Sequence, residues 1–167
     1  MSARVSSNWH GRFLSLAAHV ATWSKDPSTK CGAVIVRPDR TIASLGYNGF
    51  PRGLYDSPVL LNDREEKYKR IVHAEVNALL HMAERPIGHT LYIWPFLPCC
   101  RCATQVIQSG ITRVIAPGGS GPLWDRHDVQ LTRDMFEDAG VDAEEMDREE
   151  IDDCLRLVVR DWADGLG

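Results

Sequence analysis

The stretch that decides the fold of this chain runs from His73 to Ile107 and reads HAEVNALLHMAERPIGHTLYIWPFLPCCRCATQVI. From His73 to Arg85 apolar residues recur at helical spacing, and a Pro and a Gly follow, which predicts a helix that ends there. The β-branched and aromatic run from Thr90 to Trp94 predicts a strand. A second helix is predicted to begin at Pro98, where the missing N–H costs no hydrogen bond, and to end before Gly110.

The same periodicities extend outward on both sides of this stretch. They predict helices over 10–24, 60–70, 125–139 and 147–163, and strands over 31–37, 41–45 and 112–116. Residues 46–58 are rich in Gly and Pro and are predicted to form a loop. Strands that alternate with helices able to cover both faces of a sheet indicate an α/β fold, here a three-layer α/β/α sandwich.

Length and composition indicate one globular domain. The 167 residues are 44% hydrophobic and 25% charged, and a single domain over 1–167 agrees with a usual length of about 150 residues per domain. No apolar run approaches the roughly 20 residues of a membrane span, and Met1–His10 lacks the apolar core of a signal peptide. We therefore expect a cytoplasmic protein with no membrane partner.

The net charge of −4 hides an uneven distribution along the chain. Residues 1–124 hold 14 basic and 8 acidic residues, whereas residues 125–167 hold 5 and 15. The simpler interpretation is a solvated acidic tail helix, with 141–167 as an acidic helical extension of the same domain. The more specific hypothesis is that the basic part handles an anionic small molecule while the tail keeps the protein soluble. A nucleic-acid partner is not expected, because the densest basic stretch, 64–70, is interrupted by two glutamates.

Three of the five cysteines lie close together at the predicted start of the second helix. Cys99 and Cys102 stand three positions apart and so share a helix face. In a cytoplasmic chain, cysteines are metal ligands, nucleophiles or core residues rather than disulfides. Two thiolates and the imidazole of His73 are three of the four ligands of a tetrahedral zinc ion, which leaves one position for water. The pattern H-x-E followed by P-C-x-x-C, with Glu75 as the proton carrier, is typical of zinc deaminases.

A closed, purely structural zinc site is the alternative, and it would make the protein a non-catalytic zinc-stapled binding module. Cys100, Cys31 or Cys154 would then supply the fourth ligand. Cys100 points about 100° away from Cys99 on a helix, so we expect it to pack beside the site. Cys31 and Cys154 lie within apolar stripes and are expected in the core. Because a structural site would leave Glu75 unexplained, the pattern favours a catalytic zinc.

Five motifs occur in the order found in deoxycytidylate (dCMP) deaminases, within the zinc-dependent cytidine/deoxycytidylate deaminase superfamily. They are SKDPST at 24–29, GAVIV at 32–36, GYNGFP at 46–51, HAEVNA at 73–78 and PCxxCA at 98–103. On these motifs the chain resembles that family over about residues 9–116. The resemblance implies a cytidine deaminase-like fold with a five-stranded mixed sheet, and a homo-oligomer that is either a dimer or a hexamer.

The activity that this resemblance implies is hydrolytic deamination of dCMP to dUMP with release of ammonia, a step of pyrimidine nucleotide biosynthesis. His73, Cys99 and Cys102 would hold one Zn²⁺ per subunit. Glu75 would move protons between the attacking water, the ring N3 and the departing amino group.

The resemblance also implies contacts with the substrate and with effectors. Asn48 would contact the sugar. The candidates for the 5′-phosphate are Ser24, Lys25, Arg64 and Lys67. The effectors dCTP and dTTP would bind near the loop that contains Gly46, Tyr47 and Gly49.

One segment departs from the family pattern and leaves the substrate open. Residues 93–97 read IWPFL, one residue more than the usual family segment, with Trp94 in place of a threonine. Trp94 is either a stacking surface for the base or a core aromatic at the end of a strand. The chain is therefore predicted to act on dCMP, or alternatively on CMP, a 5-substituted dCMP or a purine such as guanine.

Overall fold

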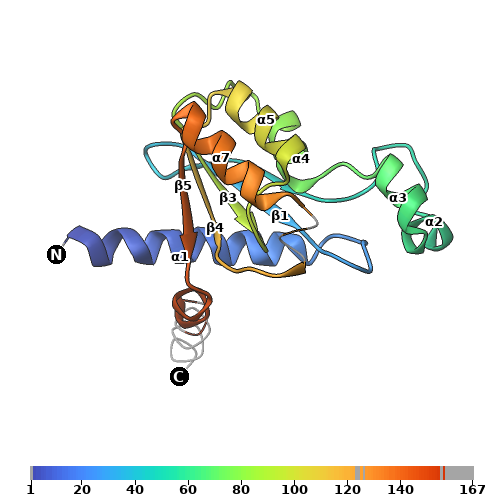
Figure 1. Ribbon diagram of the computed structural model, residues 1–167, viewed down its shortest axis with the longest axis horizontal. Helices are drawn as coiled ribbons and strands as arrows, with labels where there is room; N and C mark the ends of the chain where they lie inside the picture. Colours follow the sequence, from blue (N-terminus) through green and yellow to red (C-terminus); the bar gives the residue numbers. More distant parts are fainter. Residues whose placement is uncertain (1, 123–124, 126, 155, 157–167) are drawn as a thin grey trace.

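A five-stranded mixed sheet forms the centre of the computed structural model, which describes residues 2–122, 125, 127–154 and 156 (Figure 1). The strands, in the order in which they lie side by side, are β2 (Ile42–Tyr47), β1 (Gly32–Val36), β3 (Thr90–Trp94), β4 (Arg113–Pro117) and β5 (Asp142–Met146). β1 is antiparallel to β2 and β3, whereas β3, β4 and β5 are parallel. Parallel neighbours need crossover connections, which contain α5 (Cys100–Ser109) and α7 (Val129–Ala139). The predicted α/β class and five-stranded mixed sheet are confirmed.

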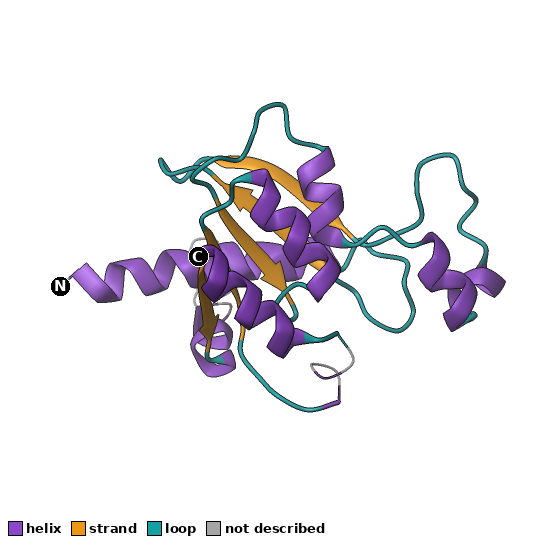
Figure 2. Cartoon of the chain, turned by 45° about the horizontal axis from the view of Figure 1, so that its top comes forward, coloured by secondary structure: helices purple, strands orange, loops and turns teal. Residues whose placement is uncertain are grey.

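Helices cover both faces of this sheet (Figure 2). α1 (Ser2–Ala21) packs on one face against β1 and β3, and α4 (Ala74–Leu80), α5 and α7 lie over the other (Figure 1). Alternation along β3 serves both layers, because Leu91 and Ile93 join the core under α4 and α5, whereas Tyr92 joins the core under α1. The predicted three-layer sandwich is therefore confirmed.

A short two-helix arm lies outside these layers. α2 (Pro58–Asn62) and α3 (Arg64–Arg70) pack on each other and stand away from the sheet (Figures 1 and 2). Asp63 separates them, because it ends α2 and its side chain accepts a hydrogen bond from the Glu66 amide at the start of α3. The helix predicted over 60–70 is therefore two helices joined at one capping residue.

Two glycines let helices approach the sheet closely from opposite sides. A Cβ atom on Gly32 would lie 2.1 Å from the Ala17 carbonyl oxygen of α1, and one on Gly46 would lie 2.3 Å from the Ala74 oxygen of α4. At such distances a side chain fits only if a backbone moves. Because α4 begins directly after His73, Gly46 sets how near that helix start lies to the sheet.

The extension predicted over 141–167, with its helix over 147–163, also contains a strand that the sequence pattern did not predict. Asp142–Met146 forms β5, an edge strand whose sequence DAEEM shows no apolar alternation and so gave no strand pattern. Pairing with β4 stabilises it, and its carboxylates form ion pairs with Arg113 of β4 and Arg133 of α7. Residues 148–154 are helical, as predicted, and most of the chain beyond them lies outside the described residues.

Several predicted helix boundaries differ from the structure, and α5 begins at Cys100 instead of Pro98. The first helix begins at Ser2 instead of residue 10. α4 ends at Leu80 rather than Arg85. α7 begins at Val129, and not directly after Asp125. Within the described part of the chain, no helix combines the length and the apolar character that a membrane crossing requires.

Gly46→Ala is expected to destabilise the protein by about 2 kcal/mol, because the added methyl group overlaps the backbone of α4 and must push that helix away. Gly49→Ala is the matched control, since a Cβ there meets nothing within 4 Å. The control should change stability by less than about 0.5 kcal/mol. Urea unfolding followed by circular dichroism measures both variants. Equal free energies of unfolding for the Gly46→Ala and Gly49→Ala variants would contradict the packing role of Gly46.

Candidate metal centre and active site

Two helix starts meet at this site. His73 is the N-cap residue of α4, and Cys99 is the N-cap residue of α5. Both have extended backbone angles, and neither side chain forms a capping hydrogen bond with its own helix. A side chain at this position often bonds a free N–H of the first turn, so these two are left available for a ligand. Cys102 follows in the first turn of α5 and is buried.

The three side chains converge at distances that fit a zinc ion. His73 Nδ1 lies 3.5 Å from Cys99 Sγ and 3.3 Å from Cys102 Sγ, and the three ligand atoms all lie within 4.8 Å of one another. A tetrahedral zinc with usual Zn–S and Zn–N bonds separates its nitrogen and sulfur ligands by about 3.6 Å. Among the described residues no fourth protein ligand joins this group, so the closed structural site weighed from the sequence does not form there.

The pKa values of the two thiols are shifted in opposite directions, because the two sulfur atoms share a hydrogen bond. Hydrogen bonds from Cys102 and His73 lower the pKa of Cys99, which favours the thiolate form of this sulfur. The Cys102 thiol holds its proton against this thiolate, and its pKa is raised. Because zinc binds thiolates, a bound ion would displace that proton.

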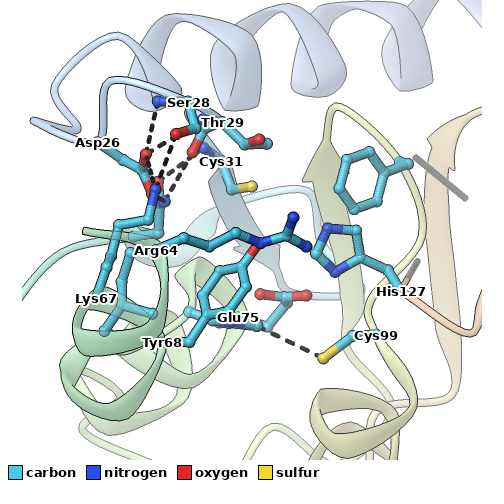
Figure 3. A pocket seen from close by; sticks show the side chains of 14 residues that line it. Asp26, Ser28, Thr29, Cys31, Arg64, Lys67, Tyr68, Glu75, Cys99 and His127 are labelled. Atoms are coloured by element: carbon cyan, nitrogen blue, oxygen red, sulfur yellow. Dashed lines mark hydrogen bonds and ion pairs between the residues drawn. The ribbon is translucent and has the colours of Figure 1, made fainter. Parts of the chain in front are cut away.

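Glu75 lies in the first turn of α4, and its carboxyl group faces a cavity (Figure 3). Only 5% of the residue is exposed. Burial raises the pKa of Glu75 to about 7, because the ionised form loses its water. A carboxyl group of this kind takes up and releases a proton near neutral pH, which suits general acid and base catalysis.

The cavity, of about 230 Å³, lies between segments that are distant in the sequence (Figure 3). The loop after α1 forms one wall, α3 forms a second, and the segments around residues 96 and 127 form a third. Its charged and aromatic wall residues are Asp26, Arg64, Lys67, Tyr68, Phe96 and His127. His73, Glu75 and Cys99 line the same cavity, so a metal ion, a proton carrier and a ligand would share one space.

A cation and several aromatic rings face one another across this space. Arg64 extends from α3 toward His127 (Figure 3), and its guanidinium lies 5.3 Å from the centroid of the Tyr68 ring. The His127 ring stacks on Phe96 with a centroid distance of 5.0 Å. Within the described residues Arg64 forms no ion pair, so its charge is available to an anion in the cavity.

Two of the residues expected to contact the substrate line the cavity, but their polar groups already form hydrogen bonds with other residues of the chain. Asn48 is buried, with its Oδ1 accepting from the Cys31 amide over 2.8 Å and its Nδ2 donating to the Thr29 carbonyl over 2.9 Å. Lys67 Nζ donates to Asp26 over 2.8 Å. Both side chains therefore hold the walls together.

Three other expected residues do not line the cavity. Ser24 is buried, and its hydroxyl donates to the Asn48 carbonyl over 2.8 Å. Lys25 is exposed and pairs with Asp56 over 2.6 Å. Trp94 packs with the core under α1, on the other face of the sheet, because it alternates with Ile93 along β3. Of the two roles weighed for Trp94, the structure places it as a strand-end aromatic.

The GYNG motif borders a separate cavity. Gly46 and Tyr47 end β2, and Gly49 pairs with Val72 across a single bridge. Tyr47 meets the Trp23 ring edge to face, with centroids 6.1 Å apart. This second cavity, of about 310 Å³, is lined by Trp23, Tyr47, Gly49, Phe50, Arg52 and His81 among others.

The remaining cysteines lie outside the metal-ligand group. Cys100 Sγ lies 3.9 Å from Asp128 Oδ2, beside the site as expected. Cys31 packs against the core under α4 and also lines the cavity, where burial raises the pKa of its thiol. Cys154 packs directly against Gly11 of α1. Cys154 thereby joins the helical segment 148–154 to α1.

Sequence reasoning missed four residues of the site. Asp26 lies within the SKDPST motif, which could have drawn attention to its carboxylate. Phe96 lies within the departing segment 93–97, and Tyr68 lies within the basic stretch 64–70. No sequence pattern points to His127, since only the fold brings that part of the chain to the cavity.

Several known deaminases match this chain in sequence. A family model described as the cytidine and deoxycytidylate deaminase zinc-binding region matches residues 7–117. An uncharacterized deaminase of Aliivibrio fischeri is 41% identical over 138 residues, which cover 81% of this chain and 92% of that protein. The deoxycytidylate deaminase of Homo sapiens is 33% identical over 157 residues, which cover 90% of this chain and 84% of the human protein.

A solved structure shows the same fold. The dCMP deaminase of cyanophage S-TIM5, in complex with dCMP and dUMP, superposes with a TM-score of 0.63 and 22% identity, covering 81% of this chain and 94% of that chain. The family model spans His73, Cys99 and Cys102, whose geometry fits the ion that the model's description names.

Cys99→Ser and Cys102→Ser are each expected to lower bound zinc to less than about a tenth of the wild-type content, because each removes one of three protein ligands. Cys100→Ser is the matched control and should retain the full content, since Cys100 lies outside the group. Zinc per chain is measured by atomic emission after dialysis. Loss of zinc from the Cys100 variant alone would contradict this assignment.

Proposed function

The chain belongs to the cytidine and deoxycytidylate deaminase family and is a zinc-dependent deaminase, and on this premise we propose that it converts dCMP to dUMP with release of ammonia. The observation that carries the proposal is the cavity that Glu75, the zinc-ligand group and the Arg64 guanidinium share. Deamination needs an activated water and a proton carrier. Binding the phosphate of a nucleoside monophosphate needs a cation. The cavity holds residues suited to each task.

The proposed mechanism assigns the proton transfers to Glu75. A zinc ion held by His73, Cys99 and Cys102 would supply hydroxide at neutral pH by lowering the pKa of a bound water. Glu75 takes the proton of the water that adds to C4 of the cytosine and delivers it to the ring N3. Glu75 then takes the proton of the C4 hydroxyl and hands it to the amino group, which leaves as ammonia while C4 becomes a carbonyl. The raised pKa of Glu75 suits both transfers at neutral pH.

Arg64 is the proposed contact for the 5′-phosphate. A phosphate dianion can receive two parallel hydrogen bonds from a guanidinium, which is the strongest form of such a contact. Arg64 reaches across the cavity and, within the described residues, has no carboxylate of its own (Figure 3). The ammonium groups of Lys25 and Lys67 are paired with Asp56 and Asp26, which makes them weaker candidates.

The aromatic wall supports a planar ring as the reacting group. Phe96 and His127 stack with an interplanar angle of 26° at the edge of the cavity. Phe96 belongs to the segment that departs from the family pattern, so it is the position at which a preference between dCMP and 5-substituted dCMP would arise. The named activity of the human relative and the ligands of the cyanophage enzyme favour dCMP among these.

Oligomerisation and regulation by dCTP and dTTP belong to the same proposal. The second cavity beside the GYNG motif combines the Trp23 and Tyr47 rings with Arg52. Aromatic rings and a cation suit a nucleoside triphosphate, because its base can stack on a ring and its phosphates can form hydrogen bonds with the guanidinium. Trp23 and Tyr47 are about half exposed, which also suits a contact with another subunit.

Glu75→Gln is expected to lower kcat by roughly a factor of 10² to 10⁴, because the amide cannot carry the proton. Bound zinc should remain at the wild-type level, since Glu75 is not in the ligand group. Glu84→Gln is the matched control at an exposed ion pair and should retain activity. Ammonia release is followed with dCMP, CMP, deoxycytidine, 5-methyl-dCMP and guanine. Absence of turnover with every cytosine nucleotide would overturn the proposed function.

Arg64→Met is expected to raise KM for dCMP by about a factor of ten or more, because a charged hydrogen-bonded contact contributes about 1.5–3 kcal/mol. Its KM for deoxycytidine, which lacks the phosphate, should change less than about threefold. Arg85→Met serves as the control, since Arg85 is exposed and does not line the cavity. Equal losses with dCMP and deoxycytidine would show that Arg64 does not recognise the phosphate.

A further inference from the structure

Lys67 carries a buried charge that the proposed reaction does not use. Its Nζ donates to Asp26 Oδ1 over 2.8 Å and to Ser28 Oγ over 3.0 Å. The side chains of Lys67 and Asp26 are each only 4% exposed. The pair therefore joins α3 to the loop after α1 through an ion pair that water screens little.

Asp26 is firmly held on the side of the main body. Its Oδ1 also accepts from the backbone amide of Ser28 over 2.8 Å and from that of Thr29 over 3.3 Å. The Asn48 side chain approaches its Oδ2 at 3.4 Å. A carboxylate held by this many donors is a rigid point of attachment, so the position of Lys67 is set by the body rather than by the arm.

The arm has few other attachments. α2 and α3 pack on each other, and neither packs extensively on another helix or strand of the described chain (Figure 1). The bridge between Gly49 and Val72 closes the base of the arm. The Gly49 nitrogen lies 3.1 Å from the Val72 oxygen, and the Val72 nitrogen lies 2.8 Å from the Gly49 oxygen. Lys25 and Asp56 form a second ion pair to the loop after α1, but Lys25 is 69% exposed, and exposed pairs contribute little.

We infer that the Asp26–Lys67 pair holds α3 against the catalytic cavity, and that Lys67 is a positioning residue that acts through Arg64 and Tyr68. These two side chains come from α3 and enter the cavity within one turn of Lys67 (Figure 3). Glu75 and the zinc-ligand group come from the starts of α4 and α5, which pack on the sheet, on each other and on α7 rather than on α3. The pair therefore controls substrate binding and leaves the chemical step intact. This inference rests on the proposed function only for the identity of the substrate.

Lys67→Met tests the inference, with Lys69→Met as the matched control on the same helix. Lys69 is 56% exposed, and its ion pairs with described residues are to Glu65 and Glu66 of α3 itself. Hydrogen exchange is measured on the zinc-loaded full chain without substrate. Lys67→Met should speed exchange of the amides of residues 64–71 by about tenfold or more, because opening of α3 becomes more populated. The control should leave these rates within about twofold of the wild type.

Kinetics give the second measurement. Lys67→Met should raise KM for dCMP by about tenfold or more, with kcat within about threefold and zinc content unchanged. If the single variant does not fold because Asp26 is left as an unpaired buried charge, Asp26→Asn/Lys67→Met is used and should show the same two effects. Wild-type exchange in residues 64–71, or a loss of kcat with unchanged KM, would overturn the inference. Since exchange needs no substrate, its outcome is separate from a failure of dCMP turnover.

Discussion

The contact between His73 and the two thiols of Cys99 and Cys102 is the constraint on which the rest of the site depends. Each side of this contact stands at the start of a helix, so the N-termini of α4 and α5 must lie side by side. β3 lies between them in the sequence and passes under both helices in the sheet. Once the strand and helix order is set, the ligands need no loop of their own to be brought together.

Glu75 takes its place as a consequence of the same helix start. A residue two positions after the N-cap is carried inward with the first turn of α4, where Gly46 allows the helix to lie close to β2. Burial of a carboxyl group costs free energy, because the ionised form loses its water. A protonated carboxyl group avoids most of this cost, so burial raises the pKa of Glu75. A pKa raised in this way is what proton transfer near neutral pH requires. The close packing of α4 against Gly46 therefore affects both the stability of the fold and the reactivity of Glu75.

The parts of the site that the sequence could predict are those whose residues are local to one element. Cys99 and Cys102 are three positions apart, so spacing alone puts them on one helix face, whereas His73 and Glu75 share only the first turn of a helix. The cavity walls are different, because Asp26, Arg64 and His127 meet only through the tertiary fold. Lys67 illustrates the difference. The sequence marks it as one cation of a basic stretch, and only the fold supplies the Asp26 that pairs with it.

The acidic strand β5 shows that charge along a sequence is a poor guide to charge in space. Residues 125–167 hold 15 acidic and 5 basic residues, which favoured a solvated helix. Yet β5 lies parallel beside β4, where Arg113 faces Asp142 and Glu144. A strand of this composition forms because backbone pairing with β4 and neutralising arginines replace the apolar face it lacks. Its charged side chains also protect the sheet edge, since charged edge strands resist pairing with other chains.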